Sequence, residues 1–257
     1  MDILQAITRR RSIRKFRAKP VAEADVMRII ECGQRAPSAC SLQTYSTIWV
    51  KDENKRRMLW EACGKQSFIL EAPVTLVPCA DIRKIMQIMK HKRYETSFEK
   101  GLGYRTKLFA IIDAALAAES MVLAAEALGL GSVFAGGALG NPKVREALDL
   151  PKGVLPISLL CIGYPDEDPP IRPRLQVDTT LFVDAYRSLQ EDQIEEDVNR
   201  MNKALLQEGY YVKYGRRSPD FSWIDNVERK LTEKKETEEA FAEEMKNAGF
   251  YPFEPVT

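Results

Sequence analysis

Several features that often reveal a protein's function are scarce in this sequence. It contains one histidine, and its five cysteines are an odd number without a Cys-x-x-Cys pair. A disulfide framework or a metal site is therefore not expected, and reduced, buried thiols fit better. Basic and acidic residues nearly cancel, 38 against 37. A chain this close to neutral has no overall electrostatic attraction for nucleic acid, so any binding of anions must come from local clusters of charge.

Long uncharged apolar runs are also missing. The longest apolar stretch, residues 108–131, contains Asp113, Glu119 and Glu126. These charges interrupt it too often for a membrane span, and its many alanines predict a helix that packs closely on several sides. The N-terminus opens on the polar helix signal of Asp2, which is not typical of a secretory leader. We therefore expect a cytoplasmic protein without a membrane or nucleic-acid partner.

The order of the predicted elements favours an α+β fold. Strands alternate with long helices, but without the regular rhythm of a doubly wound sheet. Residues 81–107 are only weakly periodic and are interpreted as a variable helical or lid region. Helices are expected at residues 2–9, from 23, at 54–63, at 108–128 and after 141–142, and strands at 47–50, 74–80, 132–135 and 156–162.

The composition changes near residue 181. From there the chain is strongly charged, with helical patterns at residues 191–206 and 223–246. It has too few apolar residues to form a second core alone. We therefore predict a main domain at residues 1–183 and a charged helical extension at 184–257, which packs on the main domain or on a partner subunit.

Two arginine clusters are candidates for binding phosphate. Arg10, Ser12 and Arg14 alternate, so an extended backbone would place all three on one side, whereas a helix would bring Arg10 and Arg14 together. In either conformation two guanidinium groups and a hydroxyl suit a phosphate. Arg172 and Arg174 flank a proline that restrains their backbone. The alternative for both clusters is ordinary solvated surface charge.

Two loops could lie against a flat ligand. The segment 36–43 is rich in small residues, and Ser41 and Gln43 add polar groups to it. Gly136 and Gly137 follow a predicted strand, and paired glycines let a backbone N–H point at a ligand ring. The glycine pair matches neither a GxGxxG fingerprint nor a Walker loop. The alternative is an ordinary turn in each case.

The joint order of these motifs resembles the nitroreductase family, from about residue 3 to residue 183. The resemblance implies an FMN-binding α+β fold with a central, mainly antiparallel sheet, and two subunits that build two active sites at their shared interface. The motifs are Arg-Arg-Ser-x-Arg at 10–14, Ala-Pro-Ser-Ala at 36–39, Ala-Cys-Gly-Lys-Gln at 62–66 with Glu-Ala-Pro-Val at 71–74, Leu-Gly-Leu-Gly at 128–131 with Ala-Gly-Gly at 135–137, and Arg-Pro-Arg-Leu at 172–175.

The resemblance also implies roles for particular residues. The first flavin-contacting segment comprises Arg10, Arg11, Ser12 and Arg14. The basic pair near the FMN phosphate is Arg172 and Arg174. The loop contributed by the other subunit comprises Pro37, Ser38, Ala39 and Ser41. The isoalloxazine ring is contacted by Gln66 and by the turn of Ala135, Gly136 and Gly137. Many relatives have Asn in place of Ser41 and Pro-Trp in place of Thr44-Tyr45, so the chain departs from the family pattern there.

The implied activity is ping-pong transfer of reducing equivalents from NADH or NADPH, through FMN, to a small electron-poor acceptor. That acceptor would be a nitroaromatic, a quinone, a flavin or a halogenated aromatic. Arg14 is the candidate for stabilising the reduced flavin, and no side chain need act as a nucleophile. Two other classes of protein are alternatives to this enzyme. One is a storage or sensing protein that holds FMN without turnover, and the other is a nucleic-acid-binding module. The near-zero net charge argues against the latter.

The predicted lid segment contains the only histidine, His91, among several basic residues. A solvated surface is the simpler interpretation, and the alternative is that Lys90, Lys92, Arg93 and Arg105 hold the nicotinamide nucleotide. Tyr94, Phe98 and Tyr104 either line an aromatic acceptor pocket or serve packing.

Overall fold

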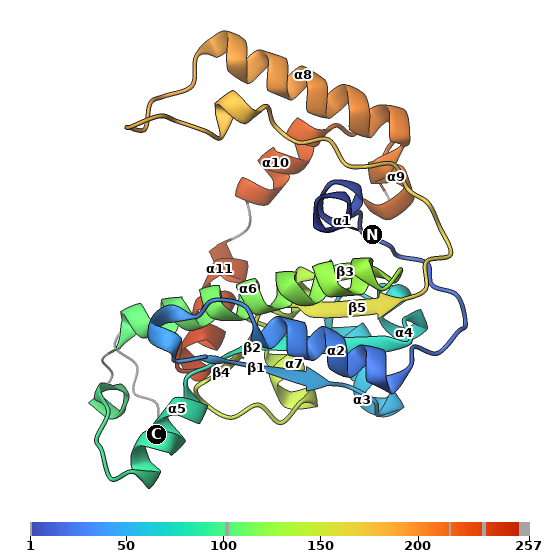
Figure 1. Cartoon of the computed structure of the whole chain (residues 1–257). Coiled ribbons are helices and arrows are strands. Elements are labelled where there is room, and N and C mark those ends of the chain that lie inside the picture. The colour runs from blue at the N-terminus through green and yellow to red at the C-terminus, as the bar shows by residue number, and fades with distance from the viewer. Residues whose placement is uncertain (1, 101–102, 216, 233–234, 252–257) are drawn as a thin grey trace. The chain divides into compact units, whose positions relative to one another are not determined.

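Figure 1 shows a computed structural model of the chain, in which residues 2–100, 103–215, 217–232 and 235–251 are described. The chain forms two compact units, one comprising Met1–Pro169 with Glu239–Thr257 and the other Pro170–Glu238. The chain is thus divided into packing units after residue 169 and after residue 238. The predicted FMN-binding domain at 1–183 and charged extension at 184–257 describe a functional division, which remains a prediction.

The first unit is built on an antiparallel sheet with strand order β1-β2-β5-β3, and β4 also pairs with β2. This confirms the predicted α+β class with its antiparallel sheet. The predicted single strand at 156–162 is wrong, because two strands occupy that region. Between them the Ile157 N–H donates to the carbonyl of Pro78 at 3.0 Å, so β2 changes partner there. The strands are β1 (Tyr45–Trp49), β2 (Val74–Asp81), β3 (Gly131–Ala135), β4 (Val154–Pro156) and β5 (Leu159–Gly163).

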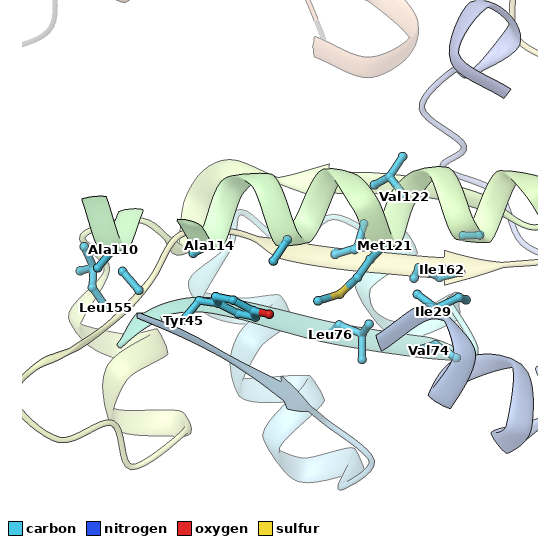
Figure 2. Close-up of a cluster of buried hydrophobic side chains, with 14 of the residues drawn as sticks. Ile29, Tyr45, Val74, Leu76, Ala110, Ala114, Met121, Val122, Leu155 and Ile162 are labelled. Atoms are coloured by element: carbon cyan, nitrogen blue, oxygen red, sulfur yellow. The ribbon is translucent and has the colours of Figure 1, made fainter. Parts of the chain in front are cut away.

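Helices cover both faces of this sheet. The helices α2 (Glu23–Gln34) and α6 (Tyr104–Ala127) pack on one face (Figure 1), and α3 (Glu53–Ala62), α4 (Phe68–Glu71) and α7 (Pro142–Ala147) contribute to the core on the other. Successive strand residues point to opposite faces. Leu76 therefore joins the core under α6, as Figure 2 shows, and the next residue, Val77, joins the core on the other face.

The long helix α6 is the core helix of the first unit. By length and composition it could cross a membrane. However, its buried residues are mostly alanines that pack against the sheet and α2 (Figure 2). Such short side chains let the helix approach its neighbours closely. The opposite side of α6 leaves Leu108, Ile112 and Leu116 40–51% exposed.

The end of the chain returns to the first unit through α11 (Lys235–Asn247). Ala248 and Phe250 are buried in the core under α6. The Gly153 N–H donates to the Ala248 carbonyl at 2.9 Å, and Arg145 forms an ion pair with the buried Glu244. The last described residues are therefore part of this core.

The second unit is helical. It contains α8 (Glu191–Glu208), α9 (Tyr210–Gly215) and α10 (Trp223–Leu231). Tyr211 is buried there and packs edge-on against Phe221, with ring centroids 5.2 Å apart. The helix predicted at 223–246 corresponds to two helices, α10 and α11, and residues 233 and 234 lie outside the described residues. The remaining helices, both in the first unit, are α1 (Ile3–Arg9) and α5 (Arg83–His91).

Candidate functional site

The N-terminal arginine segment runs in an extended conformation beside the edge strand β3. Ser12 forms a parallel bridge with Ser132, and the Ile13 N–H donates to the Ser132 carbonyl at 2.9 Å. Ile13 is buried, whereas Ser12 and Arg14 are half-buried. Because side chains alternate along an extended backbone, Ser12 and Arg14 leave it on the side opposite Ile13. Of the two conformations considered for this run, the structure has the extended one.

A second segment holds this backbone in place. The Arg14 N–H donates to a carboxylate oxygen of Glu167 at 2.6 Å, and the Arg17 N–H donates to the Tyr164 carbonyl at 2.9 Å. The Arg11 side chain forms an ion pair with Asp168. The backbone from residue 11 to 17 is therefore fixed at several points, and part of the charge of Arg11 is balanced by an acid of the same unit.

Glu126, at the end of α6, lies close to the same arginines. Burial raises the pKa of its carboxyl, while the positive charges of Arg10 and Arg11 act in the opposite direction. Three acids, Glu126, Glu167 and Asp168, thus contact or lie close to a segment that carries five basic residues between positions 9 and 15. The segment keeps an excess of positive charge, which suits an anion.

The loop after α2 adopts a strained conformation. It includes the short 3-10 turn η1 (Ala39–Ser41). In the loop, Pro37 and Ser41 are exposed, and Ser38 and Ala39 are half-buried. Cys40, Ser41 and Gln43 have φ of 50°, 54° and 51°. Positive φ is uncommon for residues other than glycine and marks strain that the surroundings must hold in place.

The anchor of this loop is a residue that sequence reasoning missed. Asp113 of α6 is 1% exposed. Its carboxylate accepts hydrogen bonds from the Ala39 N–H at 3.0 Å, the Thr44 N–H at 3.3 Å and the Thr44 hydroxyl at 2.8 Å. The available signal was a single acid on the alanine-rich face of a helix, because a buried carboxylate requires polar partners.

The glycine turn lies at the far end of β3. It forms the 3-10 turn η3 (Gly136–Ala138), and a Cβ at Gly136 would have no atom within 4 Å. A Cβ at Gly137 would lie 3.4 Å from Cys63 Cα. Gln66, which is exposed, donates to the Cys63 carbonyl at 3.0 Å. The structure therefore brings Gln66 and the two glycines into one region, next to Ala135 at the end of the strand.

These features fit FMN. The backbone of Ser12, between Arg10 and Arg14, lies beside Ser132 at one end of β3, and the open glycine backbone lies four residues further along. Four residues of strand span about 13 Å. Cationic donors at one end and unobstructed backbone at the other suit an elongated ligand with a phosphate and a flat ring.

The late arginine pair lies in the second unit, where its two members differ. Arg172 forms an ion pair with Glu208, and its guanidinium lies 4.2 Å from the centre of the Tyr210 ring. Arg174 is exposed and donates to carbonyls of its own loop at 2.9 and 3.3 Å. Both line a hollow of about 360 Å³ together with Tyr214. Packing therefore accounts for Arg172, while Arg174 remains accessible to a ligand.

Other predicted side chains have simpler environments. His91 is exposed at the end of α5. Phe98 is 7% exposed and belongs to the core under α6, so its place in an aromatic acceptor pocket is not supported, whereas Tyr94 and Tyr104 are exposed. The expectation of buried thiols holds for three cysteines and is wrong for two, Cys32 and Cys40, which are exposed.

Known proteins resemble this chain in sequence and in structure. The family model described as Nitroreductase family matches residues 7–164. An FMN reductase [NAD(P)H] from Bacillus subtilis is 33% identical over 79% of this chain and 81% of its own. An oxygen-insensitive NADPH nitroreductase from Salmonella typhimurium is 32% identical over 86% and 87%. The structure of an NADPH:FMN oxidoreductase from Vibrio harveyi complexed with NAD+ has a TM-score of 0.79, 27% identity and coverage of 96% and 97%.

The family match and these relatives together identify the chain as an oxidoreductase of the NAD(P)H-dependent flavin and nitro reductase type. The chain belongs to the nitroreductase family.

Proposed function

We propose that this chain is a cytoplasmic enzyme that binds FMN and transfers electrons from NADPH or NADH, by a ping-pong mechanism, to a small electron-poor acceptor. The acceptor classes are nitroaromatics, quinones and flavins. When bound, FMN would supply the hydride-transfer chemistry. The main support is the arrangement along β3, where the arginine segment adjoins one end and the open glycine turn follows the other.

The side chains of the chain itself would bind and orient the cofactor. Arg10, Ser12 and Arg14 offer the phosphate two guanidinium groups and a hydroxyl from a backbone that is already fixed. Such charge-assisted hydrogen bonds are the strongest that side chains make. Arg174 is a further phosphate ligand in this proposal, and a cation at Arg14 would also favour the reduced form of the flavin. The N–H groups of Gly136 and Gly137 would meet the edge of the ring.

We propose further that the enzyme works as a homodimer. Leu108, Ile112 and Leu116 form an exposed apolar stripe on α6, and Ile3 and Leu4 of α1 are 59% and 69% exposed. Large apolar side chains exposed in a row along a helix, as on α6, are typical of protein–protein interfaces. A dimer would cover it and would let the loop of Pro37, Ser38, Ala39 and Ser41 reach the FMN of the other subunit.

The direct test is an absorbance spectrum of the purified protein before and after anaerobic addition of NADPH. We expect flavin bands that bleach within seconds and return when a nitroaromatic or a quinone is added. Bands that persist would favour a protein that stores or senses FMN. A colourless protein that cannot be loaded with FMN, and that DNA retains in a salt-sensitive manner, would contradict the proposal.

A further inference from the structure

Asp113 is a buried acid that the proposed chemistry does not use. Its two oxygens have separate tasks: Oδ1 accepts from the Ala39 N–H, and Oδ2 accepts from both the N–H and the hydroxyl of Thr44. All three bonds use the aspartate as an acceptor, as a carboxylate requires. A carboxylate buried on the alanine-rich face of α6 is tolerated because these donors compensate for its lost hydration.

The two anchored residues enclose the strained part of the loop. Between Ala39 and Thr44, three residues other than glycine have positive φ. Bonds within the loop brace its middle: the Gln43 N–H donates to the Ser38 hydroxyl at 3.2 Å, and the N–H groups of Ser41 and Leu42 donate to the carbonyls of Ser38 and Ala39. A chain segment with this much strain relaxes unless its surroundings hold it. From outside the loop, the Asp81 N–H donates to the Thr44 carbonyl at 2.8 Å and holds one end, whereas the Asp113 carboxylate bonds both ends.

We propose that Asp113 is a positioning residue for flavin binding. Its carboxylate fixes the loop from Ala39 to Thr44 in the conformation that meets FMN. The inference rests on the proposed function, since it is this loop that is taken to contact the cofactor of the other subunit. It also explains the departure at Thr44, whose hydroxyl gives Asp113 a donor that a proline does not offer.

The chemistry of the carboxylate makes the proposal specific. Asparagine has the same size as aspartate, but it offers one acceptor oxygen and a donor amide. In Asp113→Asn the amide oxygen can still accept a hydrogen bond from one end of the loop. The amide N–H₂ group then faces a backbone N–H donor at the other end, where no bond can form. Thr44→Val is a milder change, because it removes only the hydroxyl and leaves both backbone bonds to Asp113. Glu244→Gln is the matched control, since Glu244 is a buried acid of the same unit, paired with Arg145.

The experiment measures FMN dissociation constants by quenching of flavin fluorescence, together with amide hydrogen exchange of the apoprotein. The loss of one hydrogen bond to a charged group corresponds to about tenfold in affinity. We expect Asp113→Asn to weaken FMN binding by about tenfold or more and Thr44→Val by somewhat less. The amides of Ala39 and Thr44 should exchange faster in Asp113→Asn. Glu244→Gln should lower thermal stability and leave the FMN dissociation constant unchanged.

Combining the two changes tests whether they act through the same loop. Residues that act as one unit are not additive, so the double variant should bind FMN no more weakly than Asp113→Asn alone. If Asp113→Asn fails to fold, Thr44→Val decides the question by itself. Wild-type affinity in Thr44→Val and in any folded Asp113→Asn protein would overturn the proposal.

Failure of the inference is distinguishable from failure of the proposed function. A wild-type protein that binds no FMN overturns both. If the wild type binds FMN and Arg174→Ala weakens it, while the Asp113 and Thr44 variants bind normally, only the role of Asp113 is lost.

Discussion

Arginines that look equivalent in the sequence differ once their neighbours are known. Arg11 and Arg172 each have an acidic partner, Asp168 and Glu208, so part of their charge is already balanced. Arg174 is exposed and hydrogen-bonds only carbonyls of its own loop among the described residues. The family motif alone could not separate these roles, because Asp168 lies 157 positions from Arg11 and Glu208 lies at the end of α8, outside the motif of Arg172.

Replacing Arg174 and Arg172 by alanine should have different effects, the first on FMN binding and the second on stability. Arg174→Ala should weaken FMN binding by about 10- to 100-fold, the equivalent of about 1.5–3 kcal/mol for a bond to a charged group. Its thermal stability should stay near that of the wild type. Arg172→Ala leaves Glu208 without its partner in a largely buried site, so we expect it to lower stability by roughly 3 kcal/mol. Titration with FMN and thermal unfolding measure the two effects, and equal stability losses in the two variants would contradict this division.

The second prediction concerns the buried thiols. Burial raises the pKa of Cys63 from 9.0 to about 11 and those of Cys79 and Cys161 to about 12. Unfolded thiols ionise earlier, so the stability that these neutral thiols contribute is complete below pH 9 and is lost as the pH rises toward 12. Denaturant titrations at several pH values measure this loss. A Cys32→Ser/Cys40→Ser variant keeps only the three buried thiols. At pH 8 a thiol reagent should label none of them until the protein is unfolded. Rapid labelling of the native variant would refute the burial of these thiols.

At the scale of elements, the sequence predicted those that carry a local signal. Asp2 and Asn141 accept hydrogen bonds from the first turns of α1 and α7, and both helices were expected. The split of β4 and β5 was missed because it depends on Pro78 in a distant strand. The strained loop was equally invisible, since its conformation is held by Asp113, about 70 positions away. Such long-range contacts leave no local pattern.

The third prediction uses the turn η3. A Cβ at Gly136 would meet no protein atom, so Gly136→Ala should fold as well as the wild type. The added methyl would, however, project from the backbone that is proposed to meet the flavin, and we expect clearly weaker FMN binding. Gly163→Ala is the contrasting control, because its Cβ would lie 2.5 Å from the rigid ring of Pro73 and should destabilise the fold. Unchanged affinity in Gly136→Ala would place the flavin elsewhere.

In the complete chain, the exposed apolar face of α6 is a feature that the helical pattern of the sequence did not predict. The apolar stretch at 108–131 indicated a helix buried on several sides, yet Phe109 and Ile112 are 37% and 51% exposed. Periodicity alone could not separate burial inside a subunit from burial between subunits, because both use the same residue types. The stripe on α6 is explained if a second copy covers it.

The last prediction tests that arrangement through mixed dimers. A symmetric dimer has two equivalent sites. If the loop held by Asp113 serves the opposite subunit, Asp113→Asn damages the site of the partner, whereas Arg14→Ala damages the site of its own subunit. A dimer with one subunit of each kind then has both defects in one site and an intact second site.

Co-expression with two different affinity tags isolates this mixed dimer. We expect it to bind one FMN with wild-type affinity and to bleach that flavin with NADPH, although neither parent variant binds FMN tightly. If the loop and the arginines served the same subunit, each site of the mixed dimer would carry one defect. No site of wild-type affinity would then remain, and the crossed arrangement of loop and phosphate would have to be abandoned.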